Sequence, residues 1–191
     1  EYSIPLWDVS NPNAPVEFAA LTGFAGAVRT FAISNDGKIL VSETWDIDNG
    51  STVVLWDVSN PSLPFELASF SLAEAIRSFS FSPDDNRLFA GLWNASEILQ
   101  WNISDLQKPR RINDLLGHHN DVNRLAFSPD GTQIATASRD GTIKLWDPAK
   151  TEPLRSFVGH SDAVSRVAFS PDGTRIATTS SDKTAKLWDV S

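Results

Sequence analysis

The chain has 191 residues, a formal net charge of −8 at pH 7, and neither cysteine nor methionine. Without cysteine, disulfides, thiolate metal sites and thiol catalysis are excluded. The acidic balance argues against general binding to nucleic acid or an anionic membrane, which both need basic surface. No apolar run approaches the roughly 20 residues of a membrane-spanning helix. We therefore expect a globular protein with neither kind of partner. Its compartment is unknown, with the cytoplasm favoured.

The chain begins with glutamate and contains no methionine. Because translation starts at methionine, we expect a processed product or part of a longer protein. A tryptophan followed by Asp or Asn recurs at positions 7, 56, 101, 146 and 188, with spacings of 49, 45, 45 and 42 residues. A period in the forties indicates a repeat architecture.

The predicted elements are short strands in a fixed order. A leading strand over 3–8 contains Trp7. Each of four units then supplies four strands, and the fourth strand of each unit carries the repeated tryptophan at its end. Short strands at this spacing, separated by turns, indicate an all-β fold. In chain order, the first three strands of each unit are 16–21, 28–33 and 39–44, then 64–69, 76–81 and 87–92, then 109–114, 122–127 and 133–138, and finally 153–158, 164–169 and 175–180.

Each unit has one strong turn signal between its second and third strands. The four segments read SNDGK (34–38), SPDDN (82–86), SPDGT (128–132) and SPDGT (170–174). Proline fixes φ at the second position, aspartate bonds its own backbone, and glycine accepts the positive φ that closes a hairpin. The aspartates that recur in these turns are therefore expected to shape the turns and not to form an acidic site.

Two long stretches carry a family resemblance. The segments GHHNDVNRLAFSPDGTQIATASRDGTIKLWD (117–147) and GHSDAVSRVAFSPDGTRIATTSSDKTAKLWD (159–189) resemble WD40 repeats, as in bacterial WD40 arrays. The resemblance implies β-propeller blades, here four four-stranded antiparallel blades in an open arc or half-propeller. The implied repeats cover approximately 9–57, 58–102, 103–147 and 148–189, with 1–8 as a leading strand of an incomplete blade. Residues 16–21 could then close the blade that the last repeat begins.

The resemblance also implies two hydrogen-bonded tetrads. In each, aspartate accepts from a histidine ring, the histidine bonds a strand hydroxyl, and the hydroxyl bonds an indole N–H. The members are His118, Thr136, Asp140 and Trp146 in the third unit, and His160, Thr178, Asp182 and Trp188 in the fourth.

The first two units depart from this pattern. Phe24 and Leu72 stand at the histidine positions. The first unit keeps Ser42 and the candidate Asp46, whereas the second unit has Gly91 assigned to the hydroxyl position. We expect these blades to rely on apolar packing.

No catalytic residue, metal ligand or cofactor is expected. The tetrads account for two of the three histidines, and no nucleophile motif is present. The segment DIDNGS (46–51) partly resembles a calcium loop, because Asp46 and Asp48 fit the first two ligand positions. Gly50 occupies the third ligand position, however, and Asn49-Gly50 between apolar strands favours a hairpin.

Trp45 and Trp93 fall outside the repeating tryptophan series. Each lies near a turn that departs from the family pattern, so it can be an interaction anchor or a side chain folded over a blade edge. The resemblance places a partner-binding surface beside that turn and at the start of the inner strand. Its candidate residues are Arg29, Trp45, Arg77, Trp93, Asp121, Asn123, Arg139, Asp162 and Ser181.

The sequence therefore predicts a non-enzymatic protein-interaction scaffold or sensor module that presents loops on a rigid surface to a protein or peptide. The first alternative is a purely structural segment, whose partner is a second copy or the remainder of a longer WD40 chain. A propeller enzyme with a site in the central channel is a minor alternative.

Overall fold

The computed structural model describes residues 2–190, all of whose regular structure is strand. No helix long and apolar enough to cross a membrane occurs among these residues. Within this described range, seventeen strands form five antiparallel sheets, numbered here I to V in chain order. Sheet I holds β1 (Ile4–Asp8) and β2 (Val16–Leu21). Sheet II holds β3 (Val28–Ile33), β4 (Ile39–Asp46), β5 (Gly50–Asp57) and β6 (Phe65–Leu72).

The other three sheets follow the same order. Sheet III holds β7 (Ile76–Phe81), β8 (Arg87–Leu92), β9 (Ile98–Asn102) and β10 (Arg110–Arg111). Sheet IV holds β11 (Val122–Phe127), β12 (Ile134–Ser138), β13 (Thr142–Trp146) and β14 (Pro153–Val158). Sheet V holds β15 (Val164–Phe169), β16 (Arg175–Ser180) and β17 (Ala185–Asp189).

The all-β prediction is confirmed, but the number of complete blades changes. Sheets II, III and IV have four strands, whereas sheet V has three and sheet I has two. Three four-stranded sheets therefore replace the four expected. The reason is strand β2, which pairs with β1 from Ile4↔Leu21 to Asp8↔Val16 and does not pair with the last sheet. The expectation that residues 16–21 close the last blade was wrong.

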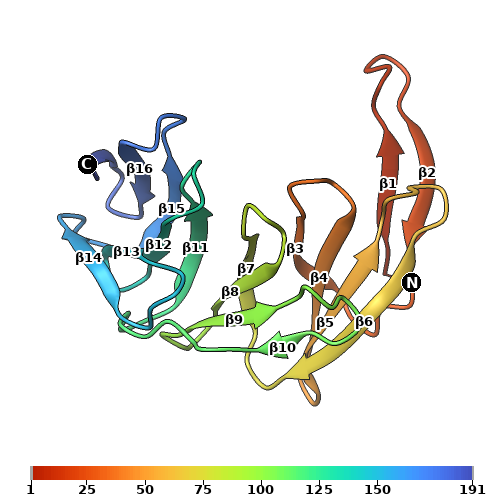
Figure 1. Ribbon diagram of the computed structural model, residues 1–191, viewed down its shortest axis with the longest axis horizontal. Coiled ribbons are helices and arrows are strands. Elements are labelled where there is room, and N and C mark those ends of the chain that lie inside the picture. Colours follow the sequence, from red (N-terminus) through yellow and green to blue (C-terminus); the bar gives the residue numbers. More distant parts are fainter. Residues whose placement is uncertain (1, 191) are drawn as a thin grey trace.

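The sheets are arranged as an open arc. Figure 1 shows them side by side in chain order, with the N-terminus and the C-terminus at opposite ends. Within residues 2–190, no strand of sheet I pairs with a strand of sheet V, so the arc stays unclosed. The repeat boundaries stay a prediction. On those boundaries, each repeat gives its first strand to one sheet and its next three strands to the following sheet.

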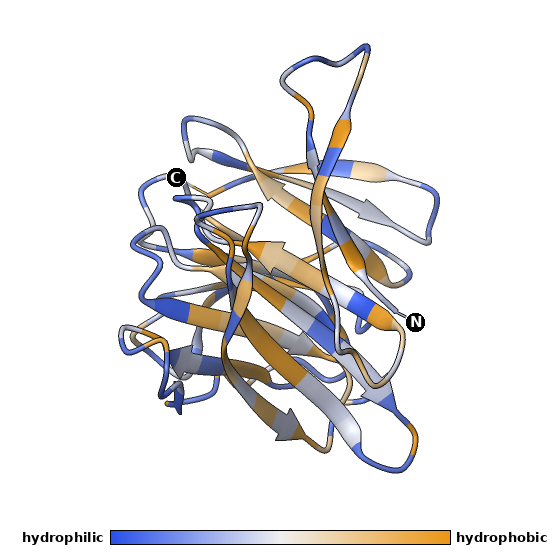
Figure 2. Cartoon of the chain, turned by 90° about the vertical axis from the view of Figure 1, so that its right-hand side faces the viewer, coloured by the Kyte–Doolittle hydropathy of each residue, from blue (hydrophilic) through white to orange (hydrophobic). Residues whose placement is uncertain are grey.

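The core lies between consecutive sheets. Leu55 of sheet II and Phe79 of sheet III share one buried cluster, and Phe89 of sheet III shares the next with Leu125 of sheet IV. Both faces of an inner sheet are therefore buried, which is why all five residues of β12 are buried. Figure 2 shows the apolar residues along the strands and the hydrophilic ones in the loops. Apolar side chains stay exposed on β3, where Phe31 is 61% exposed.

The turns between the first two strands of neighbouring sheets contact one another. In sheets II, IV and V the fourth turn residue is a glycine with φ between 71° and 73°. In sheet III this position is Asp85, with φ of 54°. The Asp85 carboxylate accepts bonds from the backbone N–H of Asn35 and Asp36, at 2.9 and 3.1 Å, and from Asn35 Nδ2 at 2.7 Å. Three hydrogen bonds thus offset the cost of a left-handed non-glycine residue, about 1–2 kcal/mol.

Candidate functional site

Sheet IV contains a buried chain of four polar side chains. His118 Nδ1 lies 2.8 Å from Asp140 Oδ2, and His118 Nε2 lies 2.7 Å from Thr136 Oγ1. The Trp146 indole donates to the same hydroxyl at 2.8 Å. Because the hydroxyl oxygen accepts a hydrogen bond from the indole N–H, its own O–H can donate to His118 Nε2, and the neutral ring then carries its proton on Nδ1. Every group is thereby paired, as burial requires.

Burial and hydrogen bonding shift the pKa values in this chain. Burial lowers the pKa of His118, because desolvation disfavours the charged ring. Burial acts to raise the pKa of Asp140, but hydrogen bonds from His118 and Thr142 hold that pKa well below its ordinary value. The arrangement therefore holds a neutral histidine against an ionised aspartate. It fixes the strands, and neither His118 nor Asp140 is exposed to a ligand.

Sheet V repeats the same chain of contacts. His160 Nδ1 lies 2.7 Å from Asp182 Oδ2, and its Nε2 lies 2.8 Å from Thr178 Oγ1. The Trp188 indole donates to that hydroxyl at 2.8 Å. Hydrogen bonds, led by that from Thr184, lower the pKa of Asp182. The structure thus brings together the members of both expected tetrads.

Sheet II keeps only one part of this arrangement. The Trp56 indole donates to Ser42 Oγ at 2.9 Å, but the histidine position is occupied by Phe24. The Phe24 and Trp56 rings meet edge to face, with centroids 5.5 Å apart. Asp46, which aligns with the tetrad aspartate, instead accepts bonds from its own hairpin, from the backbone N–H of Asp48 and Asn49. The candidate calcium segment is this hairpin, closed by Gly50 at φ of 76°.

Sheet III lacks the polar chain altogether. Its residue opposite Phe79 is Ala90, in the place that Thr136 takes opposite Leu125. The assignment of Gly91 to the hydroxyl position was therefore wrong by one residue. A Cβ atom at Gly91 would come within 2.5 Å of the Val122 carbonyl oxygen, so Gly91 instead allows sheets III and IV to approach closely.

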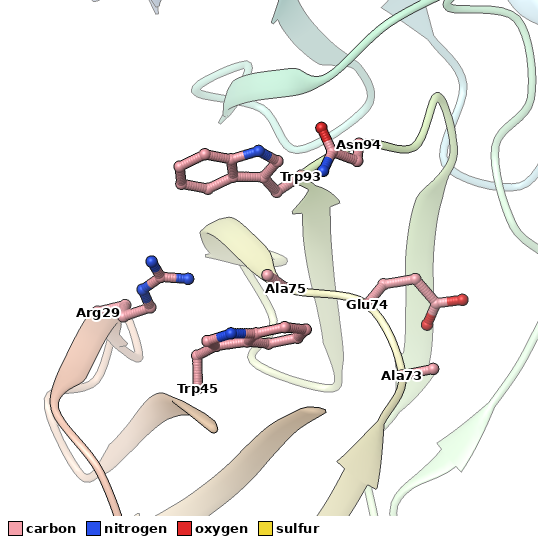
Figure 3. Close-up of a pocket in the computed structure, with 7 residues that line it drawn as sticks. All are labelled: Arg29, Trp45, Ala73, Glu74, Ala75, Trp93 and Asn94. Carbon is pink, nitrogen blue, oxygen red and sulfur yellow. The ribbon is translucent and has the colours of Figure 1, made fainter. Parts of the chain in front are cut away.

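A pocket of about 400 Å³ opens between sheets II and III, where Trp45 and Trp93 lie. It is lined by Arg29, Trp45, Ala73, Glu74, Ala75, Trp93 and Asn94. Figure 3 shows the two indole rings one above the other across the pocket, with the Arg29 side chain at one side and Glu74 at the other. Trp45 is half-buried and Trp93 is 38% exposed. The rings therefore line an open site and are not both folded over a blade edge.

Two arginines on neighbouring sheets share the Trp93 ring. The guanidinium carbon of Arg77 lies 4.0 Å from the ring centroid, and that of Arg29 lies 5.3 Å from it. Both distances are within cation–π range. Arg77 lies on β7 of sheet III, and Trp93 directly follows β8 of the same sheet, whereas Arg29 reaches across from sheet II. The pocket wall is thereby fixed by contacts from both sides of the joint.

Asp121 anchors the next joint, between sheets III and IV. Its Oδ2 accepts from Arg77 at 2.9 Å, and its Oδ1 accepts from the backbone N–H of Asn94 at 2.8 Å. Arg139 lies 3.8 Å from the same carboxylate and is 57% exposed, whereas the Asp121 side chain is only 1% exposed. Asp121 is therefore a buried support behind Trp93 and not itself a surface contact.

The remaining candidates lie farther along the arc. Asn123 Nδ2 donates to the Val164 carbonyl at 2.8 Å and so joins sheets IV and V. Asp162 accepts through its side chain from the N–H of Ala163, next in the chain, and Ser181 donates its N–H to the Ala163 carbonyl at 2.9 Å. Both are exposed, Asp162 just before β15 and Ser181 just after β16. The structure thus gathers Arg29, Trp45, Arg77, Trp93, Asp121 and Arg139 at adjacent joints, but not Asn123, Asp162 and Ser181.

Several groups at the pocket and beside it belong to no motif in the sequence. Ala73, Glu74 and Ala75 come from the connection between β6 and β7, and their place next to Trp45 depends on how sheets II and III meet. Glu43 was likewise not predicted. It is fully buried in β4, and its Oε1 accepts from Ser51 Oγ at 2.6 Å, while Oε2 has no hydrogen-bond partner among the described residues. Burial raises the pKa of Glu43. Its position inside a strand gave no sequence signal.

Among residues 2–190 there is no group of three or more His, Asp or Glu side chains arranged to hold a metal ion. Of the titratable groups at the pocket, Arg29 and Glu74 flank the indoles without a nucleophile beside them. The arrangement can stack a flat group and contact a charge, which are binding interactions.

Comparison with known proteins agrees with the repeat pattern. The family model "WD domain, G-beta repeat" matches residues 109–147 and 151–189. The chain is 37% identical over 78 residues to a serine-threonine kinase receptor-associated protein of Dictyostelium discoideum, covering 40% of this chain and 25% of that protein. It is 31% identical over 145 residues to a WD repeat-containing protein of Synechocystis, covering 73% and 37%.

A longer match is to the small ribosomal subunit protein RACK1y of rice, 29% identical over 202 residues, covering 76% of this chain and 59% of that protein. The chain thus spans between a quarter and three fifths of the length of these three relatives. Two matched repeats, one relative named for WD repeats, and antiparallel sheets with histidine–tryptophan networks all agree. Residues 109–147 and 151–189 are therefore WD40 repeats.

Proposed function

We propose that the chain is a non-enzymatic protein-interaction module that binds a protein or peptide at the pocket between sheets II and III. The observation that carries the proposal is the pair of partly exposed indoles, Trp45 and Trp93, on an open cavity of about 400 Å³. Tryptophan and arginine are enriched among residues that dominate binding energy at interfaces. Both line this cavity.

The supporting structure around the pocket favours binding without rearrangement. Arg77 stacks on Trp93 and pairs with the buried Asp121, which also holds the backbone at Asn94. A side chain held in place before binding loses little conformational entropy when a partner docks. The Dictyostelium relative is named as a receptor-associated protein. This name supports a role in protein assembly for this chain too.

Affinity capture from the source organism tests the proposal. The wild-type chain, the double variant Trp45→Ala/Trp93→Ala, and a matched control, Trp7→Ala, are immobilised at equal density. Trp7 is 49% exposed on β1, away from the pocket. We expect a defined set of captured proteins to fall at least tenfold in the double variant and to persist in the control.

Equal capture by all three proteins would contradict the proposal. Capture of the chain itself, unaffected by the pocket variant, would favour the alternative of a self-assembling structural segment.

A further inference from the structure

The charges around the two indoles indicate what kind of group the pocket accepts. We infer that the pocket binds an aromatic side chain of a partner peptide whose neighbouring residue is acidic. The ring would lie between Trp45 and Trp93, and the carboxylate would pair with Arg29. This inference rests on the proposed function and names its ligand class.

The shape of the pocket suits a flat apolar group. Figure 3 shows the indoles one above the other, with Ala75 between them at the back of the cavity. The small side chain of Ala75 leaves the space between the rings open. Aromatic rings gain about 0.5–1.5 kcal/mol from such contacts beyond their buried area. An aromatic ring therefore uses both indoles, whereas a small side chain would use neither fully.

The charge at the pocket argues against a cationic guest. Two guanidiniums, those of Arg77 and Arg29, already lie within 5.3 Å of the Trp93 centroid. A third cation at that ring would be repelled by both guanidiniums. Lysine and arginine side chains are thus poor candidates for the site.

Arg29 is available to a carboxylate. Arg29 is exposed and forms no ion pair within 4.0 Å among residues 2–190, although its charge also acts on the buried Glu43 carboxylate, where it opposes the rise in pKa that burial causes. Arg77, its equivalent in sheet III, has its carboxylate partner in Asp121. Arg29 instead makes a cation–π contact with Trp93, and this contact does not use the N–H donors of its guanidinium. A ligand carboxylate can accept from those donors in a charge-assisted bond.

Glu74 makes the pocket asymmetric. It is exposed on the wall opposite Arg29 in Figure 3. A carboxylate beside Glu74 would be repelled, and one beside Arg29 would be attracted. The pair of opposite charges therefore orients an acidic peptide, with its carboxylate at the Arg29 side of the ring.

Titration of defined peptides tests the inference. The probes are the acetylated and amidated tripeptides Asp-Phe-Asp, Asp-Ala-Asp and Lys-Phe-Lys, added to ¹⁵N-labelled protein at 150 mM salt. The indole N–H resonances of Trp45 and Trp93 are assigned from the variants Trp45→Phe and Trp93→Phe. We expect Asp-Phe-Asp to shift both resonances saturably, with a dissociation constant at least tenfold below that of either other peptide.

Two variants separate the charge effect from folding. Arg29→Gln should weaken Asp-Phe-Asp binding about tenfold, whereas Glu74→Gln should leave it unchanged or strengthen it. Both side chains are exposed, so both variants should fold. Equal or tighter binding of Lys-Phe-Lys, equal binding of Asp-Ala-Asp, no saturable binding of any peptide, or no effect of Arg29→Gln would overturn the inference. If capture in lysate still required Trp45 and Trp93, the interaction function would stand and only this ligand class would fall.

Discussion

Sheets IV and V differ from sheets II and III in the buried polar contacts that join their strands and in one residue near the end of the second strand. Sheets IV and V each contain a four-member polar network. At the position where sheets II and III carry Trp45 and Trp93, sheets IV and V carry Arg139 and Ser181. Sheet II replaces the histidine with Phe24, and sheet III replaces the hydroxyl with Ala90. The regular repeats are thus the structurally uniform part, and the pocket occurs where the repeat pattern is lost.

The strongest test of this comparison is to remove one hydroxyl from each kind of sheet. Thr136→Val leaves both the Trp146 indole and His118 Nε2 without a partner, which we expect to lower the free energy of unfolding by about 3 kcal/mol. Ser42→Ala leaves only the Trp56 indole unpaired, and we expect about 1–2 kcal/mol. Urea denaturation measures both, and equal losses would show that the polar network adds nothing beyond one hydrogen bond.

A smaller effect of opposite sign is expected at Glu43. Its carboxylate is buried with one oxygen unpartnered, so Glu43→Gln should raise the free energy of unfolding at pH 7 by about 1 kcal/mol. Burial raises the pKa of Glu43, so the folded state binds its proton more tightly than the unfolded state. The penalty therefore accrues as pH rises above about 4.5 and vanishes below it.

The same denaturation series at pH 4 and pH 7 checks this prediction. Glu74→Gln is the matched control, because Glu74 is exposed and should change stability by no more than about 0.5 kcal/mol. A gain for Glu43→Gln that is independent of pH would mean that charge burial is not its cause.

The smallest effect concerns the pH dependence of sheet IV. Burial lowers the pKa of His118 below its ordinary 6.5. As pH falls below 6.5, the His118 ring therefore binds a proton more readily in the unfolded state than in the folded state. The contribution of His118 is full above pH 6.5 and decreases as pH falls below it. Asp140, whose pKa is lowered, stays ionised through this window. Thermal melting between pH 7 and pH 5 should show a shallower slope for His118→Gln than for wild type and His119→Gln, whereas three equal slopes would contradict it.

The fold was largely predictable from the sequence because its signals are local. Turn residues and the tryptophan period located the inner strands, and β3, β7, β11 and β15 have the bounds that alternation predicts. The chain of contacts around His118 also follows from residue spacing. Strand β10 is shorter than predicted, because Ile112 and Leu115 bond to sheet III outside a regular ladder. The pairing of β2 with β1 depends on how distant segments meet, which spacing does not reveal.

The candidate site was only partly predictable. Trp45 and Trp93 stood out because they depart from the tryptophan period, and Arg29 and Arg77 because they share a position. Ala73, Glu74 and Ala75 did not stand out, because they belong to the connection between β6 and β7, which contains no motif. The distinction between Asp121 and Asp162, one buried beneath an arginine and the other exposed, arises from the neighbouring sheet. Such contacts between sheets are set by tertiary packing.

The turn at Asp85 limits how far the repeats are interchangeable. A repeat array invites the view that any unit can be exchanged for another of the same consensus. Here the Asp85 carboxylate of one unit accepts hydrogen bonds from Asn35 and Asp36 of the unit before it. A unit with the consensus glycine at position 85 would adopt its own turn more easily, but it would lose the hydrogen bonds to Asn35 and Asp36. Any chimera that swaps sheet III must therefore carry the 34–38 turn with it.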